Sequence, residues 1–112
     1  MTVDQRNVID MLGVDKQRND TAVLWISDHL DWNDPRNEHL AILQDKLNYY
    51  LAIIESGALF EIYPAARGKK VVIQVVGKYA LSDIASQFYT RAKKLISDAG
   101  FELEFNLLPE EP

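Results

Sequence analysis

The stretch KKVVIQVVGKY, residues 69–79, contains a nearly continuous run of β-branched side chains. Alternate residues of an extended strand point to opposite faces, and in this stretch both sets are apolar. The two sets are Val71, Ile73 and Val75 on one face and Val72 and Val76 on the other. A strand that is apolar on both faces is typical of the interior of a sheet. We therefore predict that this segment is the central strand of the fold.

Three further segments have strand character. VIDMLGV (8–14) and TAVLWIS (21–27) are rich in β-branched or aromatic residues, and the polar turn formers DKQRND separate them, which predicts an antiparallel hairpin. FELEFNL (101–107) alternates strictly between apolar and polar residues, as a half-buried strand does. Asp10 falls inside the first of these strands, and we expect it to be an exposed residue on an edge strand.

Two helices are predicted from their capping residues. Asp34 followed by Pro35 supplies an N-cap oxygen and a first helical residue that needs no amide partner. This first helix should run to about Ser56, with Gly57 in the left-handed conformation that ends many helices. Ser82 is placed to cap a second helix. Gly100 is placed to end it.

The first helix carries two apolar stripes rather than one. The core-facing stripe at helical spacing consists of Leu40, Leu43, Leu47, Tyr50, Leu51 and Ile54. The second stripe, nearly opposite, consists of Ile42, Tyr49 and Ile53. Something must cover this second stripe: the following segment 58–68, a second copy of the chain, or another protein. The second helix has a single predicted apolar face made of Ile84, Phe88, Ala92, Leu95, Ile96 and Ala99.

The predicted element order is ββαβαβ. It indicates an α+β fold, a two-layer sandwich with a four-stranded, mostly antiparallel sheet and two helices on one face. The last strand–helix–strand unit is the place where a parallel crossover is compatible with the short return at Gly100. We expect one domain over residues 1–112, with 108–112 a frayed tail.

Composition narrows the classes of function. The 112 residues include no cysteine, which excludes disulfides and thiolate chemistry. The net charge is −5, with ten acidic and five basic residues in positions 1–56, so nucleic acid and anionic membranes are not expected partners. The apolar runs are too short to span a membrane, and the polar N-terminus does not resemble a signal peptide. We therefore expect a cytoplasmic protein.

Both histidines of the chain fall in ISDHLDWNDPRNEH, residues 26–39, among several acidic side chains. If a metal were bound, the candidate ligands would be Asp28, His29, Asp31 and His39. No H-x-x-x-H pair is present, and each acidic residue has a structural task available, such as capping a helix or bonding turn amides. We therefore predict no metal site and no cofactor. An acid–base pair of His29 with Asp28 or Asp31 is the corresponding catalytic hypothesis.

Trp32 lies in the same acidic loop, just before the first helix. It either packs onto the first helical turn or stays exposed as an anchor for a partner. The glycine-rich phosphate loops and the G-x-S-x-G nucleophile motif are absent from the chain.

Three blocks of the chain resemble a known family: ISDHLDW, EHLAILQDKLNYYLAIIESGALFEIYP and GKKVVIQVVGKY. They are similar to a family of short bacterial proteins catalogued as a domain of unknown function, and the similarity extends over residues 8 to 105. The resemblance implies a bacterial, cytoplasmic, single-domain α+β protein. It implies no activity, cofactor or catalytic residue.

Three functional hypotheses follow. The first is a non-enzymatic binding domain, of the inhibitor or immunity type, whose acidic half meets a basic partner. Its candidate binding surface is His29, Asp31, Trp32, Ile42, Tyr49 and Ile53. The second is a small metal-dependent hydrolase built on Asp28, His29, Asp31 and His39. The third is a homodimeric domain with an unknown small ligand.

Overall fold

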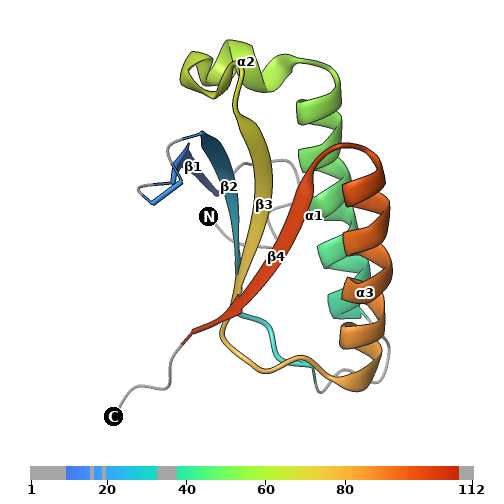
Figure 1. Cartoon of the computed structure of the whole chain (residues 1–112). Helices are drawn as coiled ribbons and strands as arrows, with labels where there is room; N and C mark the ends of the chain where they lie inside the picture. Colours follow the sequence, from blue (N-terminus) through green and yellow to red (C-terminus); the bar gives the residue numbers. More distant parts are fainter. Residues whose placement is uncertain (1–9, 16, 19, 33–37, 109–112) are drawn as a thin grey trace.

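The fold is a four-stranded sheet with helices packed on one face, as the computed structural model shows (Figure 1). The structure describes residues 10–15, 17–18, 20–32 and 38–108. The strands are β1 (Met11–Val14), β2 (Thr21–Asp28), β3 (Lys70–Gly77) and β4 (Glu102–Leu107). The helices are α1 (Glu38–Glu55), α2 (Ala58–Ile62) and α3 (Asp83–Asp98), with a 3-10 turn, η1 (Pro64–Ala66), after α2.

The sheet has the order β1-β2-β3-β4 and is mixed. β1 and β2 form the predicted antiparallel hairpin, with Leu12 opposite Leu24. β2, β3 and β4 are parallel to one another, so the prediction of a mostly antiparallel sheet is wrong. The physical reason is that a helix lies in each connection after β2. A helix carries the chain back along the sheet, so the next strand starts from the same end.

β3 lies between β2 and β4, as its two apolar faces predicted. The helix-facing side of the sheet meets α1 and α3, which lie side by side across it (Figure 1). The core between the two layers contains, from the strands, Ala22, Leu24, Ile26, Val71, Ile73, Val75 and Leu103. From the helices it contains Leu43, Leu47, Tyr50, Ile54, Tyr89 and Ile96.

The helix ends follow the capping predictions where they can be seen. The Ser82 hydroxyl accepts a hydrogen bond from the amide of Ala85 at 3.1 Å, which is the N-cap interaction expected there. Gly57 and Gly100 have φ angles of 82° and 94°, the left-handed conformation that glycine adopts most easily. The predicted cap at Asp34 and Pro35 lies outside the described residues.

The short helix α2 and the turn η1 were not predicted. They occupy residues that read as an irregular segment, because five helical residues are too few for a periodic pattern. Leu59 of α2 is fully buried, so this segment closes the end of the core beyond α1.

Two sequence predictions about side-chain exposure are wrong. On α3, Ile84 is 54% exposed and Leu95 is 70% exposed, so the helix does not bury one continuous apolar face. The buried face of α3 carries Ala85, Tyr89, Ala92 and Ile96, so it includes only Ala92 and Ile96 of the predicted face. Asp10 precedes β1, and its side chain is 4% exposed rather than solvated, because it pairs with Lys46 of α1.

The Asp10–Lys46 pair connects the residue just before β1 to the buried side of α1. Lys46 is fully buried, and its Nζ donates to Asp10 Oδ1 at 2.8 Å. Asp10 Oδ2 accepts the amide of Ser27 at 3.0 Å. The Tyr50 hydroxyl accepts the amide of Asp10 and donates to the carbonyl of Trp25. These hydrogen bonds satisfy both buried charges at once, as a low-dielectric interior requires.

Candidate functional site

The candidate site lies where β2 and β3 end and α1 begins. Asp28 ends β2 and pairs with Gly77, the last residue of the adjacent parallel strand β3. His39 is the second residue of α1, the helix that follows β2. In open sheets with parallel strands, ligands bind outside the carboxyl ends of those strands. The topology therefore brings Asp28 and His39 to the carboxyl end of the parallel strands, where ligand sites usually form.

Asp28 and His39 form a buried pair at this edge. The His39 Nε2 lies 2.8 Å from Asp28 Oδ1 and 2.7 Å from Asp28 Oδ2. The two side chains are 3% and 2% exposed. The other ring nitrogen, Nδ1, lies 2.8 Å from the backbone carbonyl oxygen of Asp31.

The partners of His39 determine which ring nitrogens carry hydrogen. A carbonyl oxygen only accepts, so Nδ1 must donate to Asp31. On the other side, Nε2 shares a proton with the Asp28 carboxyl group, which is acceptor-only when ionised. Both ring nitrogens are thus committed to protein partners. In this arrangement His39 has no lone pair to offer to a metal ion or to a substrate proton.

Two further contacts hold the turn between β2 and α1 around this pair. The amide of Leu30 donates to Asp28 Oδ1 at 3.2 Å. The indole of Trp32 stacks on the His39 ring, with 3.5 Å between ring centroids and 13° between planes. Stacking of an indole on an imidazole ring is favourable. Trp32 therefore packs onto the first turn of α1, which is one of its two predicted roles.

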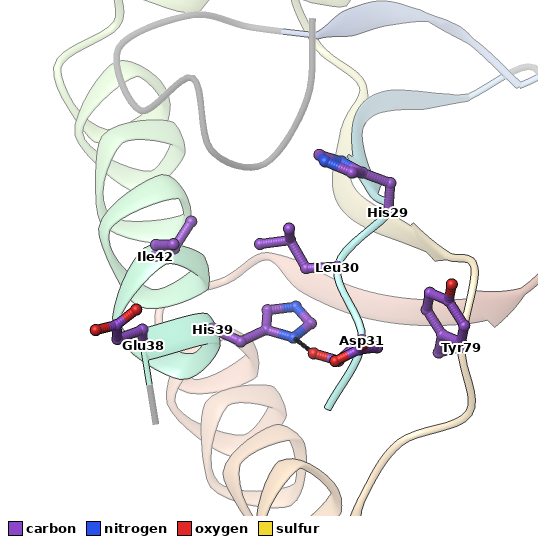
Figure 2. A pocket seen from close by; sticks show the side chains of 7 residues that line it. All are labelled: His29, Leu30, Asp31, Glu38, His39, Ile42 and Tyr79. Atoms are coloured by element: carbon purple, nitrogen blue, oxygen red, sulfur yellow. Dashed lines mark hydrogen bonds between the residues drawn. The ribbon is translucent and has the colours of Figure 1, made fainter. Parts of the chain in front are cut away.

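A shallow pocket of about 340 Å³ lies beside the Asp28–His39 pair. Its lining comes from three segments: the residues after β2, the start of α1 and the residues after β3. The lining residues are His29, Leu30, Asp31, Glu38, His39, Ile42 and Tyr79 (Figure 2). Leu30 and Ile42 face one another, whereas Glu38 lies on the far side of α1's first turn and Tyr79 on the opposite wall. The pocket thus combines an apolar centre with a polar, partly acidic rim.

A buried hydroxyl lies close to the pair from the side of α3. The Tyr89 side chain is 2% exposed, and its hydroxyl has no hydrogen-bond partner within the part of the chain that the structure describes. Burial and the nearby negative charge of Asp28 raise the pKa of Tyr89 well above its usual range. The phenol therefore stays neutral.

The space next to Tyr89 is filled by Phe105, whose ring lies 5.3 Å from the Tyr89 ring. A Cβ atom on Gly77 would lie 2.6 Å from Phe105 Cε2, so only glycine fits at the end of β3 while this ring is in place. Tyr89, Phe105 and Gly77 form the inner wall behind the Asp28–His39 pair.

The structure brings some of the predicted binding residues together and separates others. His29, Asp31 and Ile42 line the pocket, and Trp32 stacks on one of its walls. Ile53 lies about three turns after Ile42 on α1 and is only 8% exposed. Tyr49 is half-buried against the core, with its ring edge against Tyr50. The second stripe of α1 is therefore not one continuous open surface.

The predicted metal ligands do not converge. Among residues 10–15, 17–18, 20–32 and 38–108, no group of three or more His, Asp or Glu side chains is placed to hold a metal ion. His29 is exposed, whereas Asp28 and His39 are buried and bonded to each other. This end of the sheet therefore holds a closed, hydrogen-bonded Asp28–His39 pair beside an open pocket.

Sequence reasoning missed Tyr79, Glu38 and Leu30 as pocket residues. Tyr79 follows the last residue of β3 by two positions, so it could have been found if β2 and β3 had been recognised as parallel neighbours. Leu30 and Glu38 lie inside the stretch that drew attention to the histidines. Their sequence positions alone did not distinguish them from ordinary turn and helix residues.

Comparison with known families identifies the relatives of this chain. A family model described as a family of unknown function, DUF6572, matches residues 1–109. The chain belongs to DUF6572. The resemblance inferred from the three sequence blocks is thus confirmed at the level of the family. Searches of curated proteins and of solved structures gave no match.

Within the described part of this DUF6572 chain, no helix is long and apolar enough to cross a membrane. The longest is the 18-residue helix α1, which carries Asp45 and the buried Lys46 in its middle.

Proposed function

We propose that this DUF6572 domain is a non-enzymatic binding domain whose pocket receives a cationic side chain of a protein partner. The observation that supports the proposal is that His39 is buried and fully hydrogen-bonded, whereas the pocket beside it is open. The one histidine held in a buried, pre-organised geometry has both nitrogens committed to Asp28 and to the Asp31 carbonyl. The other side chains that line the pocket are better suited to binding a partner than to transferring a proton.

The character of the pocket favours a basic partner. Leu30 and Ile42 offer apolar contact for the methylene groups of a lysine or arginine side chain. Asp31 and Glu38 supply negative charge at the rim, and the chain as a whole has a net charge of −5. An acidic domain of this kind steers a basic partner toward it and orients it on contact. An inhibitor of an enzyme with a basic surface would use such a pocket.

The proposal can be tested with a defined peptide. A short acetylated peptide with two arginines is titrated into ¹⁵N-labelled protein, and a peptide with glutamates in their place serves as the control ligand. We expect shifts of the Ile42 and Tyr79 signals with the arginine peptide alone. Glu38→Gln should weaken binding by about two- to fivefold, the usual worth of one rim charge.

A matched control variant is available at the opposite end of the sheet. Glu102 is exposed at the start of β4, so Glu102→Gln removes the same charge away from the pocket. If Glu102→Gln weakens binding as much as Glu38→Gln, or if the glutamate peptide binds equally well, the pocket is not a cation site.

A further inference from the structure

A second apolar surface lies on the outer side of the helical layer, away from the pocket of the proposed function. A groove of about 350 Å³ runs between α1 and α3. Its walls are Leu47, Leu51, Phe88, Ala92, Leu95 and Ile96, with Gln44, Asn48 and Arg91 at the edges. Leu95 is 70% exposed, which is unusual for a leucine that also lines a groove.

The apolar residues of α3 fall into two groups: those buried against the sheet and those that line this groove. Phe88 and Leu95 are two turns apart on α3 and face the groove, whereas Tyr89 and Ile96 beside them face the sheet. The apolar sector of α3 is therefore wide enough to contact two surfaces. The sheet covers only one of them.

The charges of the two helices are complementary. α1 carries the acidic residues Glu38, Asp45 and Glu55, and its single lysine, Lys46, is buried in the core. α3 carries an exposed basic cluster, Arg91, Lys93 and Lys94, in its second half, between the exposed Asp83 and Asp98 at its two ends. The basic cluster of α3 in one copy can therefore face the acidic residues of α1 in a second copy that is rotated by 180°. A twofold axis parallel to the helices would place α1 of each copy against α3 of the other.

The size of this surface is adequate for a dimer. α1 and α3 have 18 and 16 residues, and helices of that length extend about 27 and 24 Å. Two adjacent helices about 10 Å wide present a projected area of about 500 Å² per copy. A specific interface buries at least about 1,000 Å² in total, that is, about 500 Å² from each partner.

We infer that the α1–α3 groove is the interface of a symmetric homodimer, in which Leu95 of each copy enters the groove of the other. This interface differs from the one predicted from the sequence, which used Ile42 and Ile53. Ile53 is 8% exposed and has little area left to contribute.

Sedimentation equilibrium of the full chain tests this inference. At concentrations up to about 0.5 mM we expect the wild type to approach twice its 12.8 kDa monomer mass. Leu95→Glu should remove self-association, whereas Ile62→Glu, a control on α2 at a side chain 55% exposed, should leave it unchanged. Arg91→Glu should weaken the dimer at least about tenfold because it places like charges across the interface.

Circular dichroism confirms that each variant is folded, and Arg91→Glu decides the question if Leu95→Glu does not fold. A wild type that stays monomeric over this range, or Leu95→Glu and Arg91→Glu variants that dimerise like the wild type, would overturn the inference. Equal loss with Ile62→Glu would place the interface elsewhere. Because neither Leu95 nor Arg91 lines the Ile42 pocket, this outcome is independent of the peptide titration.

Discussion

The buried pair of Asp28 and His39 makes the strongest prediction about stability. Its members are 2% and 3% exposed and are joined by two contacts of 2.7 and 2.8 Å. Removing one member of such a pair leaves the other buried without a partner, which costs about 3–5 kcal/mol. We expect Asp28→Ala and His39→Ala each to lower the free energy of unfolding by an amount in this range. His39→Ala also removes the stacking of Trp32 on the imidazole ring, so its loss of stability should be the larger of the two.

Urea denaturation followed by circular dichroism measures these losses, and the double variant completes a thermodynamic cycle. The double variant should cost little more than the worse single variant, which gives a coupling energy close to the smaller single loss, about 3 kcal/mol. His29→Ala is the control, because it removes an exposed histidine side chain next to the pair and leaves Asp28 and His39 in place. Single losses below about 1 kcal/mol, or additive losses in the double variant, would refute the reasoning.

Three further variants test other parts of the structure by the same denaturation measurement. Tyr89→Phe removes a buried hydroxyl without a partner, so it should stabilise the protein by about 1 kcal/mol, and a loss of stability would show that the hydroxyl is bonded. Gly77→Ala should destabilise by about 1–3 kcal/mol, because its Cβ meets the Phe105 ring; an unchanged midpoint would contradict this packing. Lys46→Met should cost about 3 kcal/mol, since it leaves the Asp10 carboxylate buried alone, and Asp10→Asn in the same background should recover part of that loss.

Much of the fold could be predicted from local sequence patterns. The two-sided apolar run of β3 identified the central strand, and Ser82, Gly57 and Gly100 marked helix boundaries. These signals are local, because capping and left-handed turns involve residues a few positions apart.

Strand direction and side-chain pairing were harder to predict because they depend on distant parts of the chain. Six of the eight residues of β2 are buried, and they include residues on both faces, which is typical of a parallel strand. The hairpin before β2 nevertheless suggested an antiparallel sheet. Asp10 and Lys46 lie 36 residues apart, and Asp28 and His39 lie 11 apart. No periodicity connects such pairs. The stretch with both histidines correctly indicated that the candidate site lies at the carboxyl ends of the strands. Only the fold shows that His39 is buried and hydrogen-bonded whereas His29 is exposed.

The most direct test of the account is long-range ¹H–¹⁵N NMR of the His39 ring, with and without the arginine peptide. The central claim is that His39 is a locked structural group beside a pocket that binds. We therefore predict that the Nδ1 proton, and the proton shared between Nε2 and Asp28, are protected from solvent and stay unchanged when the peptide shifts the Ile42 and Tyr79 signals. A His39 ring that exchanges freely with solvent, or one that responds to the peptide while Ile42 and Tyr79 do not, would contradict it.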